Sequence, residues 1–287
     1  MPEKLTARAS LTTVARARFL PPRSRYRVKR PLLMMLVGFG LQLGALAHAA
    51  PVAKPEALEL TVSLNDKKVG IETLRTQSGQ EGRYDSLDAS LQDKVNKAWK
   101  SFQQRATLDS QADGTIKSYR RGIYVTGATI NTNLFSYNGG WRIGAQADAG
   151  GKPKVTDVKL KAPFVVLDER SVALVVLAAE RLQKLGDADY VRVDNATSGH
   201  LTLTTETLAA EGKHWTRLHL KDGKNVNLEV LKAPGGQVVA VKGLEGWTGV
   251  TTGQKVPANL TPVAKDAKPA ELPAGATPTH HIKPVVP

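Results

Sequence analysis

Short stretches of alternating apolar and polar residues, separated by tight turns, constrain the fold of this chain most. The stretch LELTVSLN, for example, places leucine or valine at positions 58, 60, 62 and 64. That period of two is typical of a strand with one buried face. Turn signals that punctuate such stretches include Asn138-Gly139-Gly140, Lys221-Asp222-Gly223 and Pro234-Gly235-Gly236. Because successive strands return through short connections, the sequence predicts a mainly antiparallel sheet.

One stretch departs from this pattern, FVVLDERSVALVVLAAERLQKLG, residues 164–186. It predicts a fully apolar strand, Phe164 to Leu167, followed by the only long helix, 168–184. Asp168 is the expected N-cap, and Gly186 follows the last turn, where glycine is favoured. The apolar positions extend nearly around this helix, so we expect it to be buried on most sides.

A second, shorter helix is predicted over 91–102, where Leu91, Val95, Trp99 and Phe102 recur at helical spacing. A strand is the alternative for these residues. Regular alternation of strands with helices is not visible, which disfavours a doubly wound nucleotide-binding fold. The predicted fold class is therefore mainly β (α+β): a curved antiparallel sheet or half-barrel around one central helix.

Two segments resemble exported bacterial β-clam (half-barrel) proteins of uncharacterised function, which are broadly similar to outer-membrane lipoprotein carriers. They are the opening LNDKKVGIETL and the mid-chain APFVVLDERSVALVVLA. The resemblance covers about 55–250 and implies a half-barrel. A lipoprotein carrier has several lid helices where this chain has one long predicted helix, and no functional residue is transferred from the group.

The first 49 residues have the pattern of a secretory signal peptide. Arginines and lysines are dense before Pro31, an apolar run spans 32–46, and Ala47-His48-Ala49 matches a small-residue cleavage site. We expect cleavage after Ala49, with cleavage after Ala50 as the alternative. A start at Val28 instead of Met1 would give a signal of ordinary length. Two adjacent arginines do not occur before the apolar run, which favours general secretion.

Export changes the meaning of the net charge. The chain has 40 Lys+Arg and 26 Asp+Glu, but nine of the basic residues lie in the predicted signal peptide with a single acidic one. The remainder carries only a mild basic excess and no basic stripe, so nucleic acid is not an expected partner. Cysteine is absent, so disulfides and a lipidated cysteine are excluded and the core alone must stabilise the fold.

The C-terminal residues 253–287 contain seven prolines and lack apolar periodicity, which predicts a disordered Pro/Ala-rich tail. We therefore expect one β-rich exported domain over 50–252. No second apolar stretch is long enough for a transmembrane helix in the mature chain. The expected location is the periplasm or the exterior of a bacterial cell.

Catalytic motifs are missing from the sequence. It contains no G-x-S-x-G elbow, no phosphate-binding G-x-x-x-x-G-K-[ST] loop and no H-E-x-x-H helix, so we assign no catalytic residue and expect no cofactor. His200 and His219 form an alternative metal site if the strands that carry them pair as a hairpin, with Glu206 or Glu211 nearby. Our preferred interpretation places these histidines on a solvated sheet face, without a metal.

Trp99, Trp141 and Trp215 are candidate residues for lining a cavity, and packing within the sheet core is their default role. We expect an exported, soluble, non-catalytic binding protein whose apolar concavity takes a lipid, a glycan or a protein partner of the cell envelope. Two alternatives stay open. One is an envelope hydrolase with a site around the sheet histidines, and the other is an adaptor that acts through the Pro-rich tail.

Overall fold

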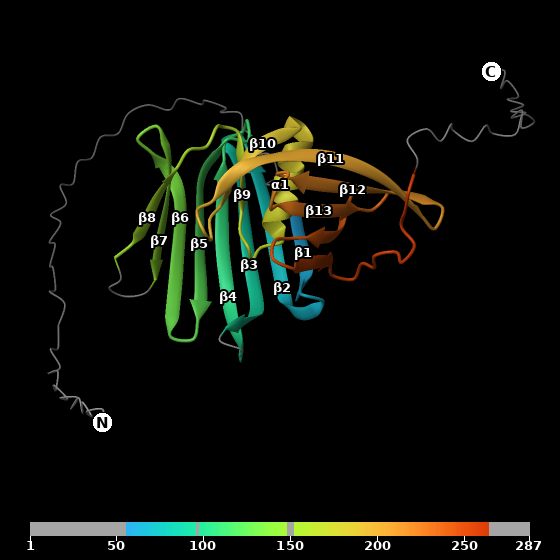
Figure 1. Cartoon of the computed structure of the whole chain (residues 1–287), viewed down its shortest axis with the longest axis horizontal. Helices are drawn as coiled ribbons and strands as arrows, with labels where there is room; N and C mark the ends of the chain where they lie inside the picture. Colours follow the sequence, from blue (N-terminus) through green and yellow to red (C-terminus); the bar gives the residue numbers. More distant parts are fainter. Residues whose placement is uncertain (1–55, 96–97, 148–151, 264–287) are drawn as a thin grey trace, which may run out of the picture. The chain divides into compact units, whose positions relative to one another are not determined.

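The computed structural model describes residues 56–95, 98–147 and 152–263 (Figure 1). The predicted signal peptide and the last 24 residues of the predicted tail lie outside the described residues. The described chain continues past the boundary predicted at 252. Its last strand, Thr261–Pro262, pairs with an earlier strand, and the Val263 backbone N–H donates to the Thr207 carbonyl at 2.9 Å.

Strands dominate the described residues. The first run comprises β1 (Glu56–Leu64), β2 (Lys67–Gly79), β3 (Gly82–Val95), β4 (Ala98–Ser110), β5 (Ile116–Val125), β6 (Ala128–Tyr137), β7 (Gly140–Ala147) and β8 (Lys154–Val158). There follow β9 (Phe164–Leu167), the helix α1 (Ala173–Leu185), β10 (Asp187–Arg192), β11 (Ser198–Ala210), β12 (Lys213–Lys221), β13 (Asn227–Lys232), β14 (Val238–Lys242), β15 (Trp247–Thr251) and β16 (Thr261–Pro262).

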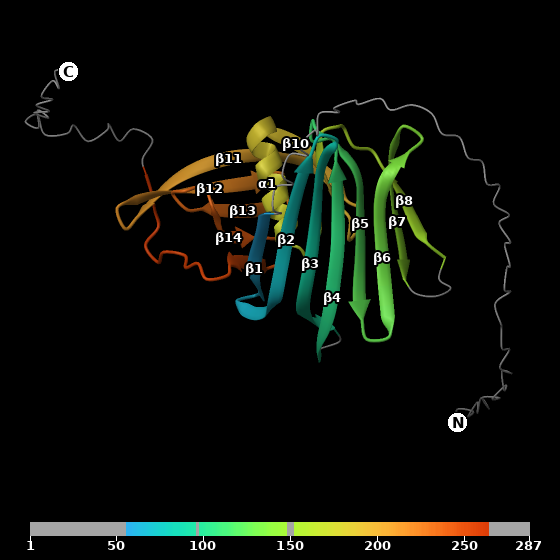
Figure 2. The same cartoon turned by 180° about the vertical axis from the view of Figure 1, so that it is seen from behind.

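All these strands belong to one curved sheet, which confirms the predicted fold class (Figures 1 and 2). Its order is β8-β7-β6-β5-β4-β3-β2-β1-β15-β14-β13-β12-β11-β10-β9, with β16 beside β11. The chain moves outward from β1 to the edge strand β8, crosses through residues 159–163 to the other edge strand β9, and returns inward until β15 pairs with β1. The two edges of the sheet are therefore consecutive in sequence.

Tight turns produce the antiparallel pairing as expected. Asn138 and Gly139 connect β6 to β7 with φ of 49° and 75°, the left-handed conformation that a two-residue hairpin turn requires. The β9–β10 pair is the exception, because it is parallel. Parallel neighbours need a crossover connection, and α1 supplies it.

Helix α1 lies inside the curved sheet and contacts strands of both runs, among them β2, β9, β11 and β13. Eight of its thirteen residues are buried, which confirms the prediction of a central helix with little exposed surface. At its C-terminus, Gly186 has φ of 83° and donates its N–H to the Leu182 carbonyl at 2.7 Å. The helix begins at Ala173, five residues later than predicted, and residues 168–172 instead bind residues of other elements.

The helix predicted over 91–102 is wrong, and the strand alternative holds. Residues 91–95 form the end of β3 and residues 98–102 the start of β4, with Leu91 opposite Phe102. Both side chains are buried, at 2% and 7% exposure, so they pack as a cross-strand pair. The helical spacing of the apolar residues was coincidental, since cross-strand pairing buries Leu91 and Phe102 and leaves Trp99 exposed.

One large apolar cluster joins both runs of strands to α1, and it includes the fully buried Leu60, Leu134, Phe164 and Leu182. A smaller cluster of Leu208, Ala210, Trp215, Leu231 and Val239 is formed by β11 to β14. The described residues contain no helix with the length and apolar character needed to cross a membrane.

Candidate functional site

A cleft of about 840 Å³ lies beside the second half of α1. We call it the α1 cleft. One wall is formed by α1 and β9, and the other by the β2–β3 and β4–β5 turns with the adjoining strand ends. Its volume falls within the range of small-molecule binding sites, about 300–1,000 Å³.

Buried aliphatic side chains form one part of the lining of the α1 cleft, which we call its aliphatic floor. It is built from Leu108 and Ile116 of the β4–β5 hairpin, Val165 and Val166 of β9, and Leu177 and Ala178 of α1. Every residue of β9 is buried, as the sequence predicted from its uninterrupted apolar run. A helix that is apolar nearly all round can face the core and still present aliphatic side chains to the cleft.

Charged residues of β3 and α1 form another part of the lining, which we call the charged rim. Arg83 of β3 forms ion pairs with Asp85, at 2.8 Å, and with Glu180 of α1, at 3.0 Å. Asp85 also accepts a hydrogen bond from the Thr76 hydroxyl at 2.6 Å. Arg83 thus pairs with both carboxylates and fastens β3 to the helix, and one basic residue faces two acidic ones here.

Arg181 of α1 differs from Arg83 in its ion pairing. Among the described residues it is the partly buried arginine without an ion pair, and its Nε is buried with no hydrogen-bond partner. Burial lowers its pKa, and the charge of Asp113 opposes that effect without forming an ion pair. The guanidinium lies against the β4–β5 turn, since a side-chain carbon on Gly114 would be 3.7 Å from Nη2.

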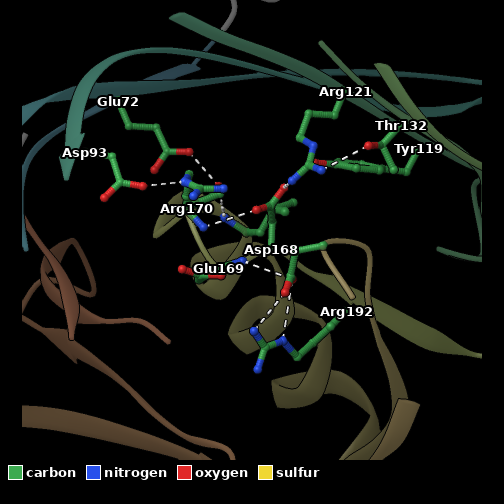
Figure 3. A network of polar contacts seen from close by, with 12 residues as sticks. Glu72, Asp93, Tyr119, Arg121, Thr132, Asp168, Glu169, Arg170 and Arg192 are labelled. Carbon is green, nitrogen blue, oxygen red and sulfur yellow. Dashed lines mark hydrogen bonds and ion pairs between the residues drawn. The ribbon is translucent and has the colours of Figure 1, made fainter. Parts of the chain in front are cut away.

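At the other end of α1, the segment 168–172 is held by a network of buried polar contacts (Figure 3). Asp168 forms an ion pair with Arg121 of β5, and both side chains are almost completely buried. Arg121 also donates to the Thr132 hydroxyl at 2.9 Å. The pair leaves little uncompensated charge inside the protein and ties the start of the helix to β5 and β6.

The next residues of this segment bind other parts of the fold (Figure 3). The Glu169 backbone N–H donates to Asp194 at 3.2 Å, and Arg170 pairs with Asp93 of β3 at 2.9 Å. Asp194 in turn pairs with Arg192 at 2.8 Å. Successive residues thus reach different elements, which fixes the position and direction of α1.

Glu72 of β2, rather than Asp168, caps the helix. Its carboxylate accepts hydrogen bonds from the Ser171 hydroxyl at 2.5 Å and from the backbone N–H groups of Val172 and Ala173 at 2.9 and 3.0 Å. These N–H groups are the ones that a helix start leaves without partners. Asp168 instead accepts the Arg170 N–H at 3.1 Å and closes the preceding turn.

Burial raises the pKa of Glu72 to about 7, against the opposing effect of its three hydrogen-bond donors. A carboxyl with such a pKa is a common feature of catalytic acids and bases. Here the side chain is completely buried, its oxygens are occupied by the helix start, and it does not line the α1 cleft. The arrangement holds the fold together and offers no reacting group to a substrate.

The three tryptophans proposed as cavity residues lie elsewhere. Trp99 is 38% exposed, with the Lys67 ammonium 3.9 Å from its ring centroid. Trp141 packs edge-on against Phe164 with the ring centroids 4.7 Å apart. Trp215 is buried in the smaller apolar cluster. None of the three lines the α1 cleft.

The structure does not bring His200 and His219 together. His200 pairs with Asp189 of β10 at 3.0 Å, whereas His219 pairs with Glu206 at 3.3 Å. In the β11–β12 register His219 lies opposite Thr204, so the two histidines are separated by four residues along the ladder, about 13 Å at the usual rise of a strand. Within the described part of the chain, no group of three or more His, Cys, Asp or Glu residues is placed to hold a metal.

The cleavage positions Ala49 and Ala50 lie outside the described residues.

Sequence reasoning did not single out Arg181 or Glu72. Arg181 left a readable signal, because it occupies a position in the helical stripe formed by Leu174, Leu177 and Ala178. A charged residue in an apolar stripe marks either a buried ion pair or a polar site. Glu72 gave no such signal, since its role depends on contacts with residues about 100 positions away.

Comparisons with known proteins add little to this geometry. No family model and no curated protein matches the chain. Among solved structures, the chain is similar to the crystal structure of a beta-barrel-like protein of domain of unknown function DUF1849 from Brucella abortus. That similarity has a TM-score of 0.42 and 10% sequence identity, and it covers 73% of this chain and 98% of the other.

Proposed function

We propose that this chain is an exported, non-catalytic binding protein whose ligand occupies the α1 cleft. The observation that carries the proposal is a cleft of about 840 Å³ with an aliphatic floor and a charged rim. Concave sites of this kind, apolar with a few placed polar groups, are typical of small-molecule binding. The polar network around Glu72 and Asp168 supports a non-catalytic role, because its groups are occupied by one another and by the helix start.

The aliphatic floor favours a lipid-like ligand over a glycan. A sugar placed against Leu108, Val165 and Leu177 would bury hydroxyl groups beside side chains that cannot hydrogen-bond. An acyl chain has no such groups, and each of its methylenes that leaves water contributes about 0.8 kcal/mol. The histidine-centred hydrolase is not favoured, since His200 and His219 lie apart and neither lines the cleft.

The experiment uses the neutral apolar dye N-phenyl-1-naphthylamine with the mature protein. We expect saturable fluorescence enhancement with wild type and at least about tenfold weaker binding with Leu177→Trp, which places a larger side chain in the cleft. Leu64→Trp is the matched control, because Leu64 is a partly buried leucine that does not line the cleft. Absence of dye binding, or equal binding by both variants, would overturn the proposal.

Export is a separate part of the proposal, and it is supported by the basic, apolar and small-residue order of residues 1–49. Cell fractionation followed by N-terminal sequencing tests it. We expect periplasmic or secreted protein that begins at Ala50, or at Pro51 if the alternative cleavage position is used. Protein recovered from the cytoplasm with its N-terminal segment intact would contradict export.

A further inference from the structure

Arg181 brings into the lining of the α1 cleft a guanidinium that forms no ion pair with any described residue. Leu174, Leu177, Ala178, Arg181 and Leu185 recur at spacings of three and four, so they share one face of α1. The guanidinium therefore projects from the helix face that supplies Leu177 and Ala178 to the aliphatic floor. A cation partly withdrawn from water without a partner is costly, and such a group calls for an explanation.

The acidic residues near the cleft do not provide that partner. Asp85 and Glu180 are engaged by Arg83. Asp113 accepts the Thr115 backbone N–H at 2.7 Å within its own turn and forms no ion pair with Arg181. The exposed Lys184 adds a second positive charge to the lining. The lining holds three basic and three acidic side chains in all, and the Arg181 guanidinium, which none of these acids pairs with, remains available to a ligand.

We propose that the α1 cleft binds an anionic amphiphile, with its acyl chain on the aliphatic floor and its carboxylate or phosphate at Arg181. This inference rests on the proposed function, because it names the ligand class of the same cleft. A guanidinium donates two parallel N–H groups to a carboxylate or phosphate, and such charge-assisted hydrogen bonds are the strong ones. Because Arg181 is only partly buried, the accessible part of its guanidinium can donate to such a head group.

The test compares dodecanoate, dodecyl phosphate and dodecanol, which share a chain length and differ in charge. Binding to the mature protein is measured by displacement of N-phenyl-1-naphthylamine at pH 7.5. For wild type we expect both anions to bind more tightly than dodecanol. With Arg181→Met we expect affinity for the two anions to fall about 10- to 100-fold, as for loss of one charge-assisted contact. Dodecanol binding should change by less than about twofold.

Two control variants sharpen the comparison. Arg120→Met removes an exposed arginine of β5 that does not line the cleft, and it should leave all three affinities unchanged. Arg181→Lys keeps the charge and should recover part of the anion affinity. Equal loss of anion and dodecanol affinity in Arg181→Met, or no loss of either, would overturn the assignment of Arg181 as the head-group site.

The source of the anion is tested with inorganic phosphate. If inorganic phosphate competes with dodecyl phosphate at a similar concentration, the site recognises a free anion and the amphiphile proposal is overturned. The proposed function fails separately. If the proposed function is wrong, neither the dye nor dodecanol binds wild type. If only this inference is wrong, dodecanol still binds wild type, and Leu177→Trp still weakens that binding.

Discussion

The charged residues at the two ends of helix α1 differ in whether they have partners within the protein. At the N-terminal end, Asp168 pairs with Arg121, Arg170 pairs with Asp93, and Glu72 accepts three hydrogen bonds from the helix start. Beside the C-terminal half, Arg181 is partly buried and has no ion pair with any described residue. The carboxylates of the first region bind other parts of the fold, and the second region lines the α1 cleft.

The difference separates two uses of polar groups in an apolar interior. A network whose members are matched to one another fixes a single arrangement of the fold, since losing any member leaves a buried charge exposed to an apolar environment. A charge left unmatched beside a cavity contributes nothing to folding that a neutral side chain would not. Such a charge can instead bind a ligand of opposite charge. Substitutions at the two ends of α1 should therefore have different consequences.

The largest effect is expected from Asp168→Asn. It preserves the shape of the side chain but removes the negative charge opposite Arg121, so the buried guanidinium loses its counter-charge. We expect the free energy of unfolding to fall by about 3–5 kcal/mol, measured by urea denaturation. Asp88→Asn is the matched control, because Asp88 pairs with Arg75 at the surface and should cost less than about 1 kcal/mol. Equal effects of the two substitutions would refute a special role for the buried pair.

A pH-dependent loss of stability is expected from Glu72. Its pKa is raised by burial from 4.5 to about 7, so the folded protein holds a proton that the unfolded chain releases between these values. The contribution of the Glu72 carboxyl to the free energy of unfolding is therefore fully present below pH 4.5 and is lost as the pH rises through about 7. The free energy of unfolding should change by on the order of 3 kcal/mol over this range.

Glu72→Gln removes this titration and keeps a hydrogen-bond acceptor for the helix start. We expect the difference in unfolding free energy between wild type and Glu72→Gln to shift in favour of the variant as the pH rises from 4.5 to 7.5. Denaturation curves at several pH values measure it. A difference that is constant with pH would show that the Glu72 carboxyl does not titrate in this range.

A smaller effect is expected from Gln104 of β4, whose side chain is 1% exposed and has no hydrogen-bond partner at either terminal atom. Methionine has a similar shape without the amide. We expect Gln104→Met to raise the free energy of unfolding by about 1 kcal/mol, because burying an unpaired amide is costly. A melting temperature that falls in this variant would contradict the interpretation of Gln104 as an unmatched core group.

Much of the fold could be predicted from local patterns. Alternating residues and turn signals such as Asn138-Gly139 specify strands and hairpins locally, and the apolar stretch 164–167 with α1 specifies a buried centre. Pairing between distant strands, such as β1 with β15, has no local signal. The misassigned residues 91–102 show the limit, because their apolar spacing fits a helix, whereas in the structure Leu91 and Phe102 are buried as a cross-strand pair.

The candidate site was less accessible to sequence reasoning. The rarity of tryptophan drew attention to Trp99, Trp141 and Trp215, whereas the cleft is lined by common aliphatic residues from four parts of the chain. Arg181 was visible only as a break in an apolar stripe. Whether such a break is matched by a partner depends on the strands packed around it, and that information exists only in three dimensions.

The most direct test of this account compares Arg121→Met with Arg181→Met in urea denaturation, without ligand and with dodecanoate. Without ligand, we expect Arg121→Met to lose about 3–5 kcal/mol and Arg181→Met to stay within about 1 kcal/mol of wild type. With dodecanoate at about 100 times its Kd, wild type should gain about 2.7 kcal/mol, and Arg181→Met should gain about half of this or less. If Arg181→Met without ligand is destabilised as strongly as Arg121→Met, Arg181 is part of the folding network and the central claim is wrong.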